Sequence, residues 1–267
     1  MCTVSFVPRT RKFYLAMNRD EKWDRFPALA PAVLNVEGHR AVFPTEPTGG
    51  TWISANDVGV CLALINWHRI KREPKNSALS RGLIVRKLAG KSSADAIAAA
   101  LKKLPLSKLR PFRLIVITPR EMRVTEWRWD LQRLRRCDHD WQRQHWFSSG
   151  FDEPRAERVR AKSCASFVAG GDDPGKGETS RRRRRAGVDA AGYSLAWLRQ
   201  LHRSHAPKRG PFSICMHRSD AATVSYTEIA VSKQRATMRY KSGPSCSNGA
   251  WVARTISLPS SSDSRKR

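Results

Sequence analysis

Residues 59–66, Gly-Val-Cys-Leu-Ala-Leu-Ile-Asn, form a nearly continuous apolar run. A run of this length predicts a β-strand in a sheet that is covered on both faces, because a half-exposed strand would alternate apolar and polar residues. The 267 residues, 40% of them hydrophobic, are enough for one large domain or two small ones with a buried core. The chain is therefore expected to fold in layers around this strand.

Strand patterns come first along the chain, helical patterns follow, and strand patterns then return. The basic turn at 9–12 predicts a hairpin between its two flanking strands, and the strands expected before the first helix are 2–8, 13–18, 39–44 and 51–55, followed by 59–66. Ser93 and Asp152 are helix start signals, and the expected helices are 80–89, 92–103, 152–167 and 190–205. Further strands are expected at 112–118, 123–130, 141–149, 211–217, 222–231 and 234–241. This order predicts an α+β fold in which helices cover sheets.

A Gly-rich, charged segment without apolar periodicity separates two of these helices. We expect a single domain over residues 1–258, with a flexible basic loop at about 169–187 and a disordered tail at 259–267. The loop contains a partial phosphate-binding pattern from Gly170 to Lys176, but Gly177 replaces the Ser or Thr that such a loop requires.

The formal net charge is +27, and the surplus is spread over the body of the chain rather than concentrated in a tail. Such a field attracts anionic surfaces nonspecifically, whether nucleic acid or membrane. No recognised nucleic-acid motif accompanies the charge. We therefore favour a solvated basic surface and expect no specific nucleic-acid partner.

Six cysteines, at positions 2, 61, 137, 164, 215 and 246, are widely spaced, with no Cys-x-x-Cys pair and no zinc-ligand spacing. Residues 137–140, Cys-Asp-His-Asp, contain metal-ligand types, but we interpret them as a charged turn, because neighbours on a strand point to opposite faces. The sequence contains no secretory or membrane-spanning run. We expect free thiols in a soluble, cytoplasmic protein with neither a metal site nor a cofactor.

Cys2 directly follows the initiator methionine. Methionine ahead of so small a residue is normally removed, which would leave a chain that begins with both a thiol and a free α-amino group. That amine titrates at about 7.7–8.0 in model peptides, so a single residue can supply the nucleophile and the base that activates it. The alternative is that Cys2 is a small apolar residue that opens a strand.

Polar residues follow two of the expected strands. The strand at 13–18 runs into Asn18-Arg19-Asp20-Glu21, which would lie beside the N-terminus if that strand pairs antiparallel with residues 2–8. A carboxylate there can hold the α-amino group, and an arginine can orient a substrate carbonyl or carboxylate; the alternative is an ordinary charged turn. Asn66 closes the strand at 59–66, and its amide is either an oxyanion donor or part of a strand-to-loop turn.

Four ordered motifs resemble one known family: Met-Cys-Thr-Val-Ser-Phe at 1–6, Leu-Ala-Met-Asn-Arg-Asp-Glu at 15–21, Pro-Thr-Gly-Gly-Thr-Trp-Ile at 47–53 and the run at 59–66. They resemble the NRDE family, which is named after Asn-Arg-Asp-Glu and includes the transport-and-Golgi-organisation 2 proteins. That family is similar to the N-terminal-nucleophile hydrolases, especially the choloylglycine hydrolase and penicillin V acylase group. The resemblance implies a four-layer αββα sandwich.

The resemblance also implies roles for individual residues. Cys2 would be the nucleophile, Asp20 would hold the α-amino group, and Asn66 would help to form the oxyanion hole. Arg19 is a looser match to a catalytic arginine of the acylases, and Met17 is the other candidate for that register.

Two further positions are expected to bind substrate, Asn18 from its place near the N-terminus and Arg218 from the resemblance. Arg218 is the match to a late active-site arginine. The acylases place a second oxyanion asparagine at a later strand end, whereas the matching residues 148–150 here are Ser-Ser-Gly.

These residues support three functional hypotheses. The first is a cysteine amidohydrolase that acts on an amide or thioester bond of a small molecule. The alternative is a non-catalytic protein that binds or carries haem or an acyl ligand, in which Cys2 would ligate iron, assisted by His68 or His217. The third, binding to nucleic acid or anionic membranes, rests on charge alone.

Overall fold

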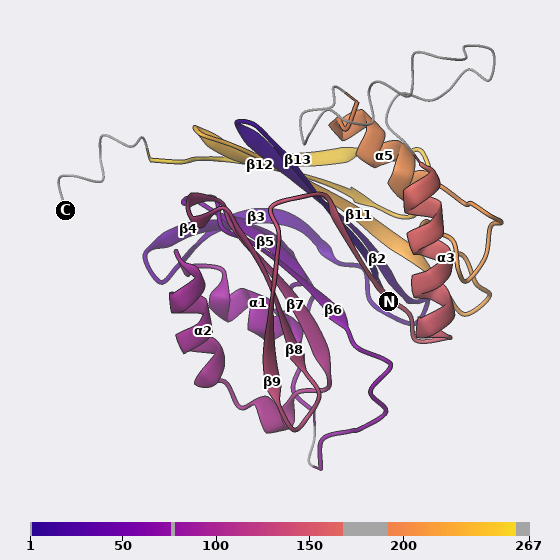
Figure 1. Ribbon diagram of the computed structural model, residues 1–267, viewed down its shortest axis with the longest axis horizontal. Coiled ribbons are helices and arrows are strands. Elements are labelled where there is room, and N and C mark those ends of the chain that lie inside the picture. Colours follow the sequence, from indigo (N-terminus) through magenta and orange to yellow (C-terminus); the bar gives the residue numbers. More distant parts are fainter. Residues whose placement is uncertain (1, 76–77, 168–191, 260–267) are drawn as a thin grey trace.

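Two antiparallel sheets form the centre of the computed structural model, which describes residues 2–75, 78–167 and 192–259 (Figure 1). The six-stranded sheet has the order β10 (Gln144–Ser148), β1 (Cys2–Arg9), β2 (Lys12–Lys22), β11 (Ala221–Ser232), β12 (Arg235–Ser242) and β13 (Trp251–Ser257). The seven-stranded sheet has the order β3 (Leu29–Val36), β4 (His39–Thr45), β5 (Ile53–Asn56), β6 (Cys61–Asn66), β7 (Phe112–Thr118), β8 (Arg123–Trp129) and β9 (Leu134–His139).

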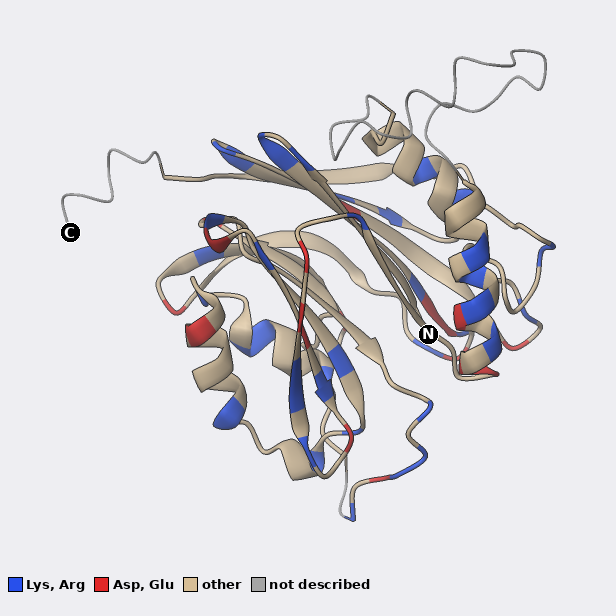
Figure 2. Cartoon of the chain, in the orientation of Figure 1, with Lys and Arg blue, Asp and Glu red and all other residues tan. Residues whose placement is uncertain are grey.

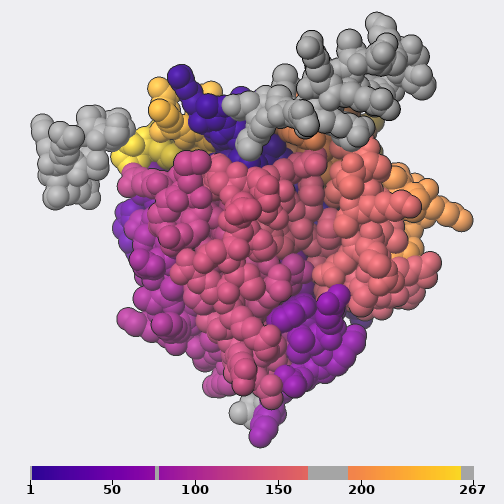
Figure 3. Space-filling view, viewed as in Figure 1, coloured from indigo at the N-terminus to yellow at the C-terminus, as the bar shows by residue number. Residues whose placement is uncertain are grey.

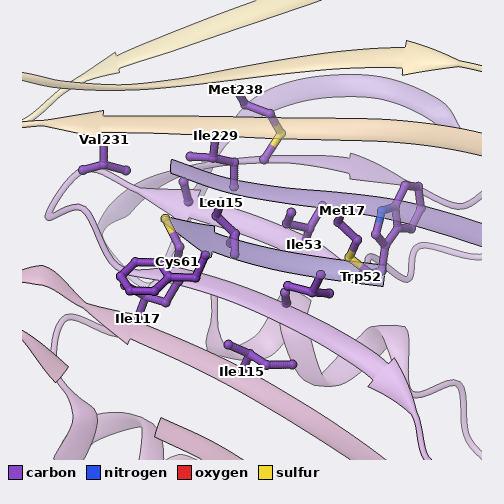
Figure 4. Packing of buried hydrophobic residues seen from close by; sticks show 14 of the residues in the cluster. Leu15, Met17, Trp52, Ile53, Cys61, Ile115, Ile117, Ile229, Val231 and Met238 are labelled. Carbon is purple, nitrogen blue, oxygen red and sulfur yellow. The ribbon is translucent and has the colours of Figure 1, made fainter. Parts of the chain in front are cut away.

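Helices cover the outer face of each sheet. The helices α1 (Gly82–Leu88) and α2 (Ala94–Lys102) pack on the seven-stranded sheet, and α3 (Glu153–Ser166) and α5 (Leu195–Arg203) pack on the six-stranded sheet. Between the sheets lies the largest apolar core, in which side chains such as Leu15, Ile53 and Ile229 point toward one another (Figure 4). The chain therefore has four layers in the order helix, sheet, sheet, helix, as expected.

The predicted apolar strand at 59–66 is confirmed as β6. In β6, Cys61, Ala63 and Ile65 belong to the core between the sheets, while Leu62 and Leu64 belong to the core beneath α1 and α2. Because successive side chains on a strand point to opposite faces, only an apolar run can serve both cores. The run ends at Asn66, where the strand leaves the covered region.

The predicted N-terminal hairpin is also confirmed, with β1 paired antiparallel to β2 over the whole length of β1. The register places Cys2 opposite Arg19 on β2 and opposite Ser148 on β10. The start of β1 therefore lies between two strand ends.

Both predicted helix start signals are confirmed. Ser93 caps α2 and Asp152 caps α3, each through a side chain that accepts a backbone N–H.

Two kinds of sequence expectation were wrong. Residues 211–217 are not a strand but a series of turns and bends between α5 and β11. The strands β3, β9 and β13 were not predicted, and residues 137–139 lie in β9 rather than in a charged turn. All three strands form sheet edges, where one side of the backbone faces solvent and mixed polar sequences are common.

Lysine and arginine residues are distributed over strands and helices of all four layers (Figure 2). On the face in Figure 3, the segment after β6 packs against residues from the middle of the chain, and Arg72 there donates to Gln132 at 2.9 Å. In the described residues, no helix has the length and apolar content that spanning a membrane requires. The expected loop at 169–187 and all but the first residue of the expected tail at 259–267 lie outside the described residues.

Candidate functional site

Cys2 lies at the mouth of the core between the two sheets, and its side chain lines a cavity of about 410 Å³. We call this cavity the Cys2 pocket. Its walls come from the ends of β1, β2 and β6, from the segments around β5 and from the start of α1. The charged and aromatic side chains that line it, together with Cys2 and Asn66, include Arg19, Glu21, Arg25, Glu46, Trp52, Arg81 and Arg110.

The Cys2 thiol is nearly buried, with the residue 7% exposed. Burial raises the pKa of this thiol, and the carboxylates of Asp20 and Glu21 act in the same direction. The backbone N–H of Asp20 opposes them by donating a hydrogen bond to the sulfur. A thiol in this position requires a nearby base if it is to react as a thiolate.

Asp20 and Arg160 form a buried ion pair on the opposite, helix-covered face of the six-stranded sheet. Both side chains are fully buried, and Arg160 Nη2 lies 3.4 Å from Asp20 Oδ2. Arg160 also donates to the backbone carbonyl of Cys2 at 3.3 Å and to Thr3 Oγ1 at 3.0 Å. Burial raises the pKa of the Asp20 carboxyl, while Arg160 and a 2.7 Å hydrogen bond from Thr223 act against that rise. The pair thus fixes the backbone of Cys2 from behind.

Arg160 was not singled out from the sequence. It lies on α3, far along the chain from the N-terminal motifs, and only the packing of that helix brings it to Cys2. A fully buried arginine without a partner would destabilise the fold, because its charge is removed from water. The ion pair with Asp20 offsets this cost.

Asn66 shares the pocket wall with Cys2, and Ser148 lies beside Cys2 on β10. Asn66 lines the Cys2 pocket, and its side chain makes no hydrogen bond within the described part of the chain. Ser148 is opposite Cys2 in the antiparallel register, so the two side chains project from the same face. Its hydroxyl is buried and has no partner among the described residues. Two unused donors therefore lie around the thiol.

Arg19 lies on the pocket side of β2, unlike its two sequence neighbours. Its guanidinium stacks on the Trp52 ring, 4.3 Å from the centroid, and pairs with Glu46 at 2.5 Å and Glu21 at 3.4 Å. Trp52 Nε1 is buried without a partner among the described residues, although Trp52 lines the same cavity. This wall of the pocket thus contains an arginine fixed by ion pairs and stacking, and an indole N–H available to a ligand.

Arg81 precedes α1 and is a pocket residue that the sequence analysis missed. It donates to the carbonyl of Pro111 at 3.1 Å, and no carboxylate among the described residues forms an ion pair with it. Burial lowers its pKa to about 10, and Arg110 adds to this effect. Arg81 therefore stays charged at neutral pH, and negative charge on Glu21, Glu73 and Cys2 acts against the lowering of its pKa.

The two expected substrate-binding residues do not line this cavity. The Asn18 amide is buried on the helix-covered face and donates to the carbonyls of His202 and Ile214, both at 2.9 Å. Arg218 pairs with Asp220 at 2.6 Å and lies over the ring of Phe151. Neither residue is part of the pocket wall, so the structure does not bring them together with Cys2.

The two histidines of the haem hypothesis are also separate from Cys2. His68 follows β6 and is largely buried, which lowers its pKa to about 3. His217 lies in the irregular segment before β11, and neither residue is among those that line the Cys2 pocket. The structure therefore does not place an imidazole together with Cys2 in this cavity.

Comparison with solved structures identifies the architecture. The chain is similar to a point variant of the conjugated bile acid hydrolase from Clostridium perfringens, with a TM-score of 0.54, 12% identity and 97% of each chain covered. It is also similar to the penicillin V acylase from Agrobacterium tumefaciens, with a TM-score of 0.51 and 12% identity, over 94% of this chain and 86% of that one. At such identities the likeness shows a shared fold, that of the N-terminal-nucleophile hydrolases.

Comparison of sequences gives a narrower result. No sequence among the curated proteins matches the chain. Residues 1–160, which hold all four N-terminal motifs together with Arg81, Ser148 and Arg160, match the model of the family described as Transport and Golgi organisation 2. The chain belongs to the Transport and Golgi organisation 2 family.

Proposed function

We propose that this protein is an N-terminal-nucleophile amidohydrolase that cleaves an amide or thioester bond of a small molecule. The observation that carries the proposal is the Cys2 thiol at the wall of a cavity of about 410 Å³, with unused hydrogen-bond donors on both sides. A buried cysteine with only a structural role has no need of such surroundings.

The first step needs the α-amino group that removal of Met1 creates. That neutral amine accepts the thiol proton, and the thiolate attacks the substrate carbonyl carbon. The Asn66 amide and the Ser148 hydroxyl donate hydrogen bonds to the oxygen, which becomes an oxyanion as the new C–S bond forms. Asp20 and Arg160 hold the N-terminal backbone in place during this step.

The second half of the cycle restores the enzyme. The ammonium gives its proton to the leaving amine or thiolate as the scissile bond breaks, which leaves a thioester on Cys2. The amine then takes a proton from water, the hydroxide attacks the thioester carbonyl, and the free acid leaves as the Cys2 thiol is reprotonated. Atoms and protons balance without a metal or redox cofactor.

The charges of the pocket indicate the kind of substrate. Four arginines, at positions 19, 25, 81 and 110, line it against the two glutamates at positions 21 and 46. Arg19 and Arg25 pair with these glutamates, whereas Arg81 has no carboxylate partner among the described residues. We therefore expect a substrate with a carboxylate or another anionic group close to the scissile bond.

The test combines intact mass with turnover. Mass spectrometry of the purified full chain is expected to show loss of Met1 and, after brief reaction with an acyl amide or thioester, an acyl adduct on Cys2. Substrates that carry a carboxylate should react faster than their neutral analogues. Cys2→Ala should abolish both adduct and turnover, while Cys137→Ser, a half-buried cysteine on β9, should leave both unchanged. Undiminished hydrolysis by Cys2→Ala would contradict the proposal, as would haem binding without any turnover.

A further inference from the structure

A second group of reactive side chains lies outside the Cys2 pocket. His205 follows α5, Cys215 and His217 lie in the irregular segment before β11, and Cys246 lies between β12 and β13. Their ligand atoms all lie within 4.8 Å of one another. We call these four residues the His/Cys cluster.

The distances within the cluster centre on one atom. Nε2 of His217 lies 3.2 Å from Nε2 of His205 and 3.5 Å from each of the sulfur atoms of Cys215 and Cys246. A neutral imidazole nitrogen carries either one proton or one lone pair, so it cannot satisfy three such neighbours by hydrogen bonds. A shared positive ion among the four atoms explains the convergence.

The same distances match one coordination geometry. Tetrahedral zinc, with bonds of about 2.05 Å to nitrogen and about 2.3 Å to sulfur, separates two nitrogens by about 3.3 Å and a nitrogen and a sulfur by about 3.6 Å. We propose that His205, Cys215, His217 and Cys246 bind a zinc ion through their two nitrogen and two sulfur atoms. Four protein ligands complete the tetrahedron, so the site is structural rather than catalytic.

The donor chemistry favours zinc over the hard cations. Thiolate and imidazole ligands suit zinc, whereas magnesium and calcium require oxygen ligands, and the cluster contains no carboxylate. Both thiols must lose their protons to solvent when the ion binds. The backbone N–H of Cys246 already points to the Cys215 sulfur, the kind of hydrogen bond that supports a bound thiolate.

Two arginines of the described residues contact the cluster, and Arg203 reaches only the backbone carbonyl of Cys246, at 3.4 Å. Arg209 Nη2 lies 3.2 Å from Nδ1 of His217, where a metal-bound imidazole would carry its proton. Arg209 is exposed, so its side chain can turn into solvent when the ion binds. Arg209→Gln removes this conflict and should therefore strengthen zinc binding.

The ion would stabilise the segment at 204–217, which has no helix or strand. The zinc ligands join the 204–217 segment to the turn after β12, and Met216, between two ligands, donates its backbone N–H to Thr223 Oγ1 at 2.9 Å. Thr223 in turn donates to Asp20 at 2.7 Å. Zinc binding would therefore stabilise the element that holds Asp20, without any contact with the Cys2 pocket.

The experiment measures metal content and ligand type in the full chain. Protein purified under reducing conditions is expected to retain about one zinc per chain. After chelation, reconstitution with cobalt(II) should give the intense visible bands of a tetrahedral site and thiolate-to-cobalt charge transfer. Cys215→Ser, Cys246→Ser and His205→Ala should each weaken zinc binding by more than about 100-fold, beyond the range typical of an outer-shell partner.

Two controls keep the result interpretable. Cys137→Ser should retain both zinc and the cobalt spectrum. His205 and Cys246 are only half-buried, so circular dichroism of His205→Ala and Cys246→Ser should show a retained fold. The wild-type cobalt spectrum needs no variant at all. An octahedral spectrum without charge transfer, stoichiometric zinc that survives all three substitutions, weaker binding by Arg209→Gln, or a Cys215–Cys246 disulfide in the reduced preparation would overturn the proposal.

Discussion

One face of β2 borders the Cys2 pocket, and the other face contacts the segment that carries part of the His/Cys cluster. The pocket is built at strand ends, from residues that short contiguous motifs already bring together in the sequence. The cluster is built from irregular segments, with ligands drawn from three separate parts of the chain. Rigid strands thus position the proposed chemistry, whereas the segment that carries the cluster has little regular structure to hold it.

The motif Asn18-Arg19-Asp20 shows how one strand serves both regions. Side chains alternate along a strand, so Arg19 faces the pocket while Asn18 and Asp20 face the helices. Asn18 binds the carbonyl of Ile214, next to the zinc ligand Cys215. Asp20 is linked through Thr223 to the backbone of Met216. Consecutive residues of a motif can therefore have different tasks, and proximity in sequence does not imply a common site.

The largest expected effect separates the two regions directly. Cys2→Ala removes the proposed nucleophile and should lower kcat for amide or thioester hydrolysis by at least about 10⁴-fold. Its zinc content should stay at the wild-type level, because Cys2 is no ligand of the cluster. Turnover assays and metal analysis of the same preparation measure both quantities. Loss of zinc in Cys2→Ala would show that the regions are not independent.

The next largest effect concerns the buried ion pair between Asp20 and Arg160, which lies behind Cys2. Arg160→Met leaves the fully buried Asp20 carboxylate without its partner and should lower the free energy of unfolding by about 3–5 kcal/mol. Arg158→Met, at an exposed position on the same helix, should change it by less than about 0.5 kcal/mol. Urea unfolding of both variants gives the comparison. Equal stabilities would mean that the buried pair contributes nothing.

Much of the pocket could be predicted because its chemistry is local. The apolar run at 59–66 predicts a strand covered on both faces and places Asn66 at its end. The hairpin of β1 and β2 follows from two apolar segments and a short turn, and it alone brings Cys2 beside Arg19. Contacts within a hairpin depend on few residues, so pattern and register determine them.

The remainder depends on packing between distant segments. Arg160 reaches Cys2 only because α3 covers the six-stranded sheet, and Arg81 reaches the pocket only because α1 begins there. The cluster spans residues 205–246, and only its Cys215-x-His217 part is close in sequence. The wrong prediction of a strand at 211–217 also prevented recognition of the cluster, because a strand lacks the turns that bring Cys215 and His217 close to the other two ligands.

A third prediction tests the oxyanion donors of the pocket. Asn66→Ala should lower kcat by about 10²–10³-fold with little change in KM, because the amide contributes mainly when charge develops on the carbonyl oxygen. Ser148→Ala should have a smaller effect in the same direction, since a hydroxyl there is one of two donors. Asn248→Ala, at an exposed position far from the pocket walls, is the matched control. A pure rise in KM for Asn66→Ala would assign Asn66 to ground-state binding instead.

The smallest expected effect is a pH dependence on the helix-covered face between the two regions. Burial lowers the pKa of His202 to about 3, against about 6.5 in an unfolded chain, and its Nε2 lies 2.9 Å from Ser5 Oγ. Because the folded pKa is the lower one, only the unfolded chain takes up this proton between about pH 6.5 and 3. The free energy of unfolding should therefore fall as the pH drops, by about 2 kcal/mol for this residue between pH 7 and 5.

His202→Gln should remove that part of the slope, whereas His39→Gln, at a partly exposed position, should retain it. Urea titrations at both pH values, with a chelator present so that metal release does not contribute, measure the difference. An unchanged slope in His202→Gln would mean that His202 takes up its proton over the same pH range in the folded and the unfolded chain. The buried histidine would then carry a charge beside Arg160, and the electrostatic account of Asp20 and Arg160 would have to include it.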